Sequence, residues 1–252
     1  MSLLEIRNMS RHFGGLKAVH NVTADIRAGD ITSLIGPNGA GKTTAFNLIT
    51  GLLPVSGGTI SFDGADITKL PPYRIAARGI ARTFQNIRIF PNMSVLENVM
   101  VGLHTQTGKG MFSAAFRLPG MKSEETFIRD EAIKQLGFVE LDCLAGQNAG
   151  NLAFGEQRKL EIARALAIKP RLLLLDEPAA GLNSQETIML GELIGRIREL
   201  GISVFLVEHD MELVMNVSDI VFVLNNGVLI ASGNPSDIQC SPEVIRAYLG
   251  DD

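Results

Sequence analysis

The sequence has few cysteines and no long uninterrupted apolar segment. Its two cysteines, Cys143 and Cys240, lie far apart and lack metal-ligand spacing, which favours reduced thiols in a cytoplasmic protein over a disulfide. The longest early uncharged stretch, residues 43–62, is interrupted by Asn47, Pro54 and glycines, so no membrane-spanning helix is expected. The first residues also lack the basic and then apolar pattern of a signal peptide, so secretion is not expected.

The sequence also lacks an excess of positive charge. It contains 23 Lys and Arg against 27 Asp and Glu, with no long run of like charge, for a net charge of −4. This balance argues against a protein whose main function is to bind nucleic acid. Because 46% of the 252 residues are hydrophobic and 20% are charged, wholesale disorder is excluded. The length fits one large domain, or one domain with an inserted subdomain.

Short apolar runs predict an α/β sheet. Runs without polar alternation are typical of strands covered on both faces, and they occupy residues 31–35, 172–175, 202–207, 220–224 and 228–231. A helix is predicted over residues 184–200, with Asn183 and Glu186 as its capping pair. The order strand, helix, strand predicts a parallel crossover. Residues 225–227, Asn-Asn-Gly, predict a hairpin that adds an antiparallel strand.

The middle of the chain, residues 94–167, has mainly helical patterns. Ser94 and Glu97 predict a capping box, and Ser123 with an acidic first turn predicts the start of a second helix. Between these helices, residues 105–119 mix glycine, hydroxyl and basic residues with a few large apolar ones. This insertion is either a surface loop or an amphipathic contact with a partner.

Residues 36–43, with the sequence GPNGAGKT, match the pattern G-x-x-x-x-G-K-[ST] between a predicted strand and a predicted helix. Glycines let backbone N–H groups turn toward a di- or triphosphate, and a helix start favours negative charge. Lys42 is predicted to reach the β- and γ-phosphates and Thr43 to bind Mg²⁺. The predicted nucleotide-binding residues of this segment are Gly36, Pro37, Asn38, Gly39, Ala40, Gly41, Lys42, Thr43 and Thr44.

Polar residues follow two other predicted strands. Asp176 and Glu177 end the strand at residues 172–175, which places Asp176 near the metal and Glu177 where it can orient or deprotonate a water. His209 follows the strand at residues 202–207, on the edge where parallel sheets bind ligands, and is predicted to contact the γ-phosphate. Nucleotide hydrolysis then proceeds as an in-line attack catalysed mainly by positioning and charge stabilisation.

In this order the motifs resemble those of an ATP-binding-cassette (ABC) ATPase subunit over essentially the whole chain. The matching segments are residues 36–43, 82–85 (RTFQ), 152–157 (LAFGEQ), 175–178 (LDEP) and His209. The resemblance implies an α/β P-loop NTPase core with a mixed, mostly parallel sheet, an antiparallel β subdomain and an inserted helical subdomain. It places the core at residues 1–88 and 158–252, and the helical subdomain, which docks on a membrane protein, at 89–157.

The resemblance also implies roles for individual residues and the use of ATP and Mg²⁺. Gln85 corresponds to the glutamine that couples the metal site to the membrane partner, so Thr43, Gln85 and Asp176 are the implied metal ligands. The implied catalytic residues are Glu177, His209, Lys42 and Gln85. Phe13 falls where the family stacks adenine on an aromatic ring. Ala153, Gly155 and Glu156 fall on the signature motif that covers the ATP of a second, head-to-tail ATPase subunit.

The signature motif departs from the family's usual Leu-Ser-Gly-Gly-Gln. Ala153 replaces the serine, Phe154 the first glycine and Glu156 the glutamine, and Asn183 replaces the aspartate that usually ends a later motif. Loss of the serine hydroxyl removes one hydrogen bond to an anion, worth about 1.5–3 kcal/mol when well formed. Gly155 still lets a backbone N–H approach a phosphate.

These departures narrow the resemblance to the larger ATPase subunit of high-affinity branched-chain amino-acid importers. That likeness implies a second ATPase chain (a heterodimer in the cell, a homodimer in isolation), two permease subunits and a periplasmic solute-binding protein, with no nucleic acid. It implies a cytoplasmic protein, peripheral on the inner face of the membrane. Two alternatives stay open, the ATPase of a lipid or lipopolysaccharide transport system and that of an importer for another solute such as amides or urea.

Overall fold

The computed structural model describes residues 2–104 and 121–249 of the chain. It divides into two compact units, one of Met1–Arg82 with Arg171–Asp252 and one of Thr83–Pro170. The sequence-based boundaries of the helical subdomain are 89 and 157, whereas these units divide at 82/83 and 170/171. Helix α5 (Phe154–Ala167) runs unbroken through position 157, which accounts for the difference at the second boundary.

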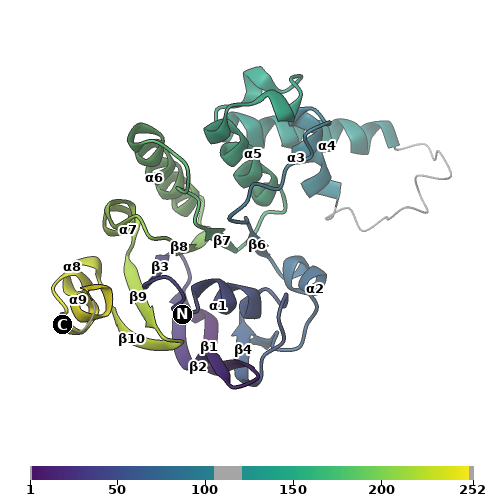
Figure 1. Cartoon of the computed structure of the whole chain (residues 1–252). Coiled ribbons are helices and arrows are strands. Elements are labelled where there is room, and N and C mark those ends of the chain that lie inside the picture. The colour runs from purple at the N-terminus through teal and green to yellow at the C-terminus, as the bar shows by residue number, and fades with distance from the viewer. Residues whose placement is uncertain (1, 105–120, 250–252) are drawn as a thin grey trace. The chain divides into compact units, whose positions relative to one another are not determined.

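The first unit contains two sheets (Figure 1). An antiparallel sheet has the strand order β2-β1-β4-β5, with β1 (Ser2–Phe13), β2 (Leu16–Arg27), β4 (Gly57–Phe62) and β5 (Ala65–Asp66). A second sheet has the order β10-β9-β3-β8-β7-β6, with β3 (Ile31–Ile35), β6 (Ile80–Arg82), β7 (Leu172–Asp176), β8 (Ser203–Val207), β9 (Ile220–Asn225) and β10 (Val228–Gly233). Its strands are parallel except β10, which confirms the predicted mixed, mostly parallel sheet with an antiparallel subdomain.

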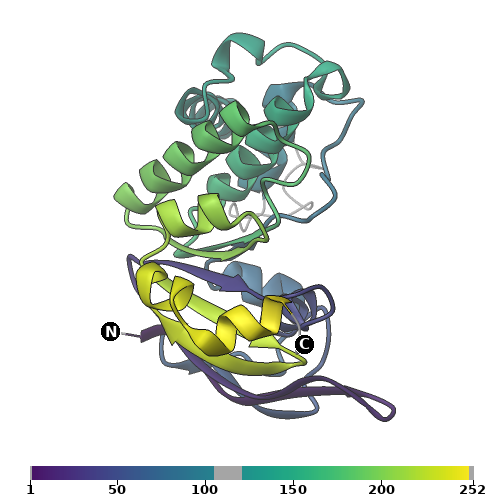
Figure 2. The same cartoon turned by 60° about the vertical axis from the view of Figure 1, so that its left-hand side comes forward.

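The main core of this unit lies between the two sheets. Helix α1 contributes Phe46, whose ring centroid lies 4.9 Å from that of Phe205 in β8. The opposite face of β9 and β10 is covered by the last helices (Figure 2). The helices of the unit are α1 (Lys42–Ile49), α2 (Pro72–Ala77), α6 (Ser184–Glu199), α7 (Met211–Val217), α8 (Pro235–Gln239) and α9 (Pro242–Leu249). Because β3, β7 and β8 are buried along their whole length, their sequences are continuously apolar.

The local predictions for this unit are confirmed. Helix α6 connects the parallel strands β7 and β8. At its start, the Glu186 N–H donates to Asn183 Oδ1 at 3.0 Å and the Asn183 N–H donates to Glu186 Oε2 at 2.9 Å, a complete capping box. Asn225 pairs with Val228, so the hairpin turn is Asn226-Gly227, and both turn residues have the positive φ that a type I′ turn requires.

The second unit is helical where it is described. It contains α3 (Val95–His104), α4 (Met121–Phe138), the 3-10 helices η2 (Asp142–Leu144) and η3 (Ala149–Asn151), and α5. The Ser94–Glu97 capping box is confirmed, with Ser94 N–H donating to Glu97 Oε2 at 2.8 Å. The predicted start of α4 at Ser123 is wrong by two residues, because Met and Lys at positions 121 and 122 extend a helix readily.

The insertion at residues 105–119 lies outside the described residues, so neither interpretation of it is decided. Within residues 2–104 and 121–249, none of the helices combines the length and the apolar character needed to cross a membrane.

Removing the α6 cap should measurably destabilise the protein. We expect Asn183→Ala to lower the free energy of unfolding by about 1 kcal/mol, because the Glu186 N–H loses its acceptor. Urea denaturation followed by circular dichroism measures the change. Gln185→Ala, at an exposed position of the same first turn, is the matched control and should change stability by less than about 0.5 kcal/mol. Equal losses in both variants would contradict a capping role.

Candidate active site

The glycine-rich loop of residues 36–43 leads from the carboxyl end of β3 into α1 (Figure 1). The Lys42 side chain turns back into this loop, where Nζ donates to the carbonyl oxygens of Gly36 at 2.7 Å and Pro37 at 3.0 Å. Burial lowers the pKa of Lys42, and the negative charge of Glu177 opposes that shift. The loop thus holds a buried ammonium group at the beginning of a helix, close enough to Glu177 to interact with it.

The backbone of this loop suits an anion. Gly36 and Gly41 have φ of 149° and 102°, and a Cβ at either would collide with a backbone carbonyl oxygen, that of Leu224 or Ala18 respectively. The first helical hydrogen bond runs from the Ala45 N–H to the carbonyl oxygen of the N-cap residue Gly41 at 2.9 Å. The preceding N–H groups at the helix start therefore remain directed at the loop, where the helix dipole favours negative charge. Asn38, Gly39 and Thr43 are exposed, and Thr44 is half-buried.

Asp176, the last residue of β7, is held by an arginine that the sequence analysis did not assign to the site. Arg82 Nη2 lies 2.7 Å from Asp176 Oδ2, with side-chain exposures of 8% and 4%. Arg82 Nη1 also donates to Asn47 Oδ1 at 2.8 Å and to Thr50 Oγ1 at 3.0 Å, both from α1 or its C-terminal end. Arg82 therefore ties the acidic strand end to the helix that follows the phosphate loop.

Glu177 and His209 come together at the same edge of the sheet. Glu177 has a φ of 46°, a conformation that a residue with a side chain rarely adopts, and its N–H donates to Val207 O at 2.9 Å. His209 Nδ1 lies 3.8 Å from Glu177 Oε2, and its side chain is 60% exposed. The strained backbone brings a half-buried carboxylate and an exposed imidazole to the same edge of the sheet, and His209 Nδ1 also lies 3.7 Å from Glu208 Oε2.

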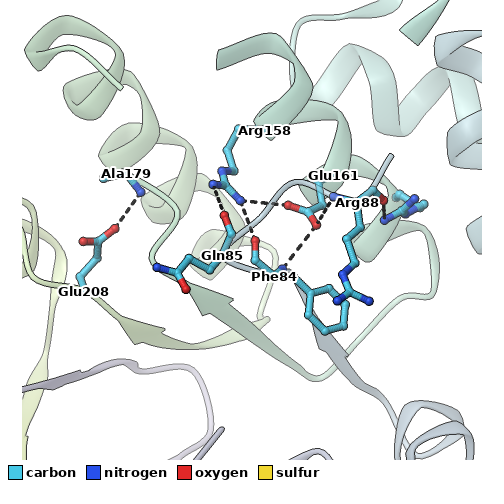
Figure 3. Close-up of polar contacts among 8 residues, drawn as sticks. Phe84, Gln85, Arg88, Arg158, Glu161, Ala179 and Glu208 are labelled. Atoms are coloured by element: carbon cyan, nitrogen blue, oxygen red, sulfur yellow. Dashed lines mark hydrogen bonds and ion pairs between the residues drawn. The ribbon is translucent and has the colours of Figure 1, made fainter. Parts of the chain in front are cut away.

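Glu208 is a second residue missing from the sequence-based site. It is fully buried, and its Oε1 accepts from the Ala179 N–H at 2.7 Å (Figure 3). Its Oε2 accepts from the His209 N–H at 2.9 Å. Burial raises the pKa of Glu208, and the backbone donors oppose that shift. Glu208 thus holds the segment after Glu177 beside the segment that carries His209. A charged residue directly after an apolar strand was the sequence signal for it.

The predicted residues of the signature motif, and Gln85, lie in the second unit. Ala153 precedes α5, and its N–H donates to Glu156 Oε2 at 2.9 Å, so half of a capping box survives without a hydroxyl. Gly155 lies in the first turn of α5. Gln85 is exposed, and its backbone oxygen accepts from Arg158 Nη2 at 3.0 Å. The structure describes these residues within their own unit, so their approach to nucleotide remains a prediction.

Phe13 ends β1, next to the Gly14-Gly15 turn. Its side chain is 43% exposed, and the Arg11 guanidinium lies 4.6 Å from its ring centroid. An exposed ring at a strand end is compatible with stacking on a purine base, and the contact of Phe13 with adenine stays a prediction.

The first unit therefore brings together the phosphate loop with Lys42, the Arg82–Asp176 pair and the Glu177–His209 pair. These features, on a mostly parallel sheet with the loop between β3 and α1, define a P-loop nucleotide-binding protein.

Comparison with known proteins identifies the class more closely. The model of the ABC transporter family matches residues 19–180, and that of the branched-chain amino acid ATP-binding cassette transporter matches residues 228–252. The chain belongs to the ABC transporter family, and its activity is ATP hydrolysis that powers transport. Membership implies membrane permease partners and a partner ATPase.

Several known proteins are similar over nearly their full length. The high-affinity branched-chain amino acid transport ATP-binding protein BraF of Pseudomonas aeruginosa is 44% identical over 250 residues, covering 99% of this chain and 98% of BraF. The corresponding protein LivG of Salmonella typhimurium is 46% identical with the same coverage. The ADP conformation of MJ1267, an ATP-binding cassette of an ABC transporter, superposes with a TM-score of 0.86 at 32% identity, covering 100% of both chains.

Removing the Arg82 side chain should leave Asp176 as a buried carboxylate without its ion-pair partner. We expect Arg82→Met to lower the free energy of unfolding by about 3–5 kcal/mol, and Arg82→Met with Asp176→Asn to lose less than the sum of the single changes. Urea denaturation measures all three variants. Arg198→Met, which breaks the exposed pair with Asp219, is the control and should lose about 0–1 kcal/mol. Strictly additive losses at Arg82 and Asp176 would show that the two side chains are not coupled.

Proposed function

We propose that this chain is the ATP-hydrolysing subunit that energises import of branched-chain amino acids through a membrane permease. The observation that best supports hydrolysis is the Glu177–His209 pair beside the loop that holds Lys42. In this pair, His209 Nδ1 lies 3.8 Å from Glu177 Oε2. For the cargo, the support is the match of residues 228–252 to the branched-chain amino acid cassette transporters, together with the names of BraF and LivG.

The phosphate loop and the residues at the strand ends have different roles in the reaction. The loop N–H groups and Lys42 bind the β- and γ-phosphates, because a buried ammonium and a helix start both stabilise negative charge. Glu177 accepts a proton from the attacking water, and His209 contacts the γ-phosphate and reports its presence to the neighbouring segment. Catalysis comes mainly from this positioning.

The chemistry of the proposed donor set fits Mg²⁺. Thr43, Asp176 and Gln85 offer hydroxyl, carboxylate and amide oxygens, the hard ligands that Mg²⁺ prefers, usually with substrate phosphates completing its shell. Arg82 donates to Oδ2 of Asp176 and so holds this carboxylate at the carboxyl end of β7. When bound, Mg²⁺ would neutralise charge on the phosphate oxygens.

We infer the assembly and location from the same likeness. The chain pairs head to tail with a second, different ATPase subunit, and Ala153, Gly155 and Glu156 cover the partner's nucleotide. Residues 89–157 dock on two permease subunits at the cytoplasmic face of the membrane, and a periplasmic binding protein delivers the solute. Phe13 stacks on adenine at the first unit's site.

Glu177→Gln tests the assignment of the base. ATP binding should be nearly unchanged, because the loop and Lys42 are intact, whereas hydrolysis should fall by about 10²–10⁴-fold. Nucleotide binding by fluorescence and phosphate release at saturating ATP and Mg²⁺ measure the two quantities. Glu186→Gln, on the capping box of α6, is the control. Unchanged hydrolysis in Glu177→Gln would reject Glu177 as the base.

The cargo is tested in the assembled transporter. Reconstituted in vesicles with its permeases and binding protein, the complex should accumulate leucine, isoleucine or valine in an ATP-dependent way, and Lys42→Ala should abolish uptake. Stimulation of hydrolysis by urea, an amide or a lipid, but not by these amino acids, would support one of the alternative cargoes.

A further inference from the structure

Helix α5 contains a fully buried ion pair that the proposed reaction does not use. Arg158 and Glu161 are 1% and 2% exposed, and Nη1 lies 3.1 Å from Oε2. Burial raises the pKa of Glu161, and the charge of Arg158 opposes that shift. Burying two charges is expensive unless further hydrogen bonds satisfy them, and a pair of apolar side chains would often stabilise a core equally well. The other partners of this pair therefore indicate what it does.

Those partners are the backbone of a single loop. Arg158 donates through Nη1 to Phe84 O at 2.8 Å and through Nη2 to Gln85 O at 3.0 Å. Glu161 Oε1 accepts from the Phe84 N–H at 3.4 Å and from the Arg88 N–H at 3.3 Å. Figure 3 shows the two side chains reaching from α5 to this loop. The ion pair thus binds both donors and acceptors on residues 84–88.

The far end of the same loop is also fixed. Asn98 of α3 is fully buried, and it accepts from the Phe90 N–H at 2.8 Å and donates to Phe90 O at 3.1 Å. The loop has no regular secondary structure of its own, so side chains of α3 and α5 take the place of backbone pairing. Gln85 itself stays exposed.

We propose that Arg158 and Glu161 are a positioning pair that locks Gln85 to the first turn of α5, so that Gln85 and the residues Ala153, Gly155 and Glu156 move as one rigid piece. The helix connects the two groups directly, because Ala153 immediately precedes it and Arg158 lies just over one turn further on. A nucleotide that displaces Gln85 then displaces the signature motif by the same movement. The inference rests on the proposed function, which assigns both groups to ATP sites.

The local part of the proposal is tested by hydrogen exchange on the full chain. The double variant Arg158→Met with Glu161→Met removes both buried charges at similar volume, so no lone charge is left in the core. Exchange of peptides covering residues 84–88 should accelerate by about tenfold or more, while peptides from β7 and β8 should not change. Lys159→Met, which breaks the surface pair with Glu140 on the same helix, is the matched control and should leave residues 84–88 unchanged. Unchanged exchange at residues 84–88 in the double variant would overturn the proposal.

A second variant keeps the test valid if the double variant does not fold. It distinguishes a positioning role of Arg158 from a purely stabilising one. Arg158→Lys keeps the charge beside Glu161, but a single ammonium lacks the planar fork that contacts two successive carbonyl groups. We expect a melting temperature close to that of the parent, a KM for ATP within about twofold and a kcat reduced by about tenfold. A purely structural role would lower the melting temperature with kcat unchanged, and that outcome would refute positioning.

Gln85→Ala distinguishes failure of this proposal from failure of the proposed function. If Gln85→Ala impairs hydrolysis but the double variant leaves hydrogen exchange at residues 84–88 unchanged, the positioning role of Arg158 and Glu161 is refuted. The proposed function in ATP hydrolysis is then retained. If exchange responds as expected but Gln85→Ala hydrolyses ATP normally, the lock exists, yet Gln85 has no part in hydrolysis and the proposed coupling is overturned.

Discussion

The sheet edge that carries the phosphate loop, the acidic residues and His209 depends on the parallel pairing of β3, β8 and β7 inside the core. Val207, at the end of β8, pairs with Leu34 of β3 on one side and with Asp176 of β7 on the other. Because parallel strands end at the same edge, the phosphate loop, the acidic pair and the histidine emerge side by side. Burial on both faces leaves the three strands little freedom to change register. A shift of one residue would reverse the side chains of a strand and separate these groups.

Beyond the strand ends, buried charged side chains hold the irregular segments that carry the chemistry. Lys42 binds the carbonyls of its own loop, Glu208 accepts from the N–H groups of Ala179 and His209, and Arg158 with Glu161 binds the loop around Gln85. Hydrogen bonds to backbone groups offset part of the cost of burying each of these charges. The consequence is that exposed groups such as His209 and Gln85 sit on fixed backbone, which suits catalysis by positioning.

The unusual signature motif also has a structural basis. The N–H of Ala153 is bound by the Glu156 carboxylate, the half of a capping box that does not need a serine. Phe154 is 48% exposed and its ring lies 6.0 Å from the Arg158 guanidinium. The start of α5 is therefore well formed without the usual serine, and Gly155 remains in its first turn.

The sequence by itself determined much of this protein, because short-range patterns encode it. The apolar runs predicted β3, β7, β8, β9 and β10, Asn183 and Glu186 predicted a helix start, residues 225–227 predicted a turn, and residues 36–43 predicted the phosphate loop. Asp176, Glu177 and His209 were recognisable because each follows a buried strand. Only the tertiary structure showed that Arg82 holds Asp176, that Glu208 joins two loops, and that Arg158 and Glu161 bind residues some 73 to 77 positions away. These contacts link segments distant in the chain, and a charged residue in a sequence does not disclose whether folding will bury it or which backbone groups will meet it.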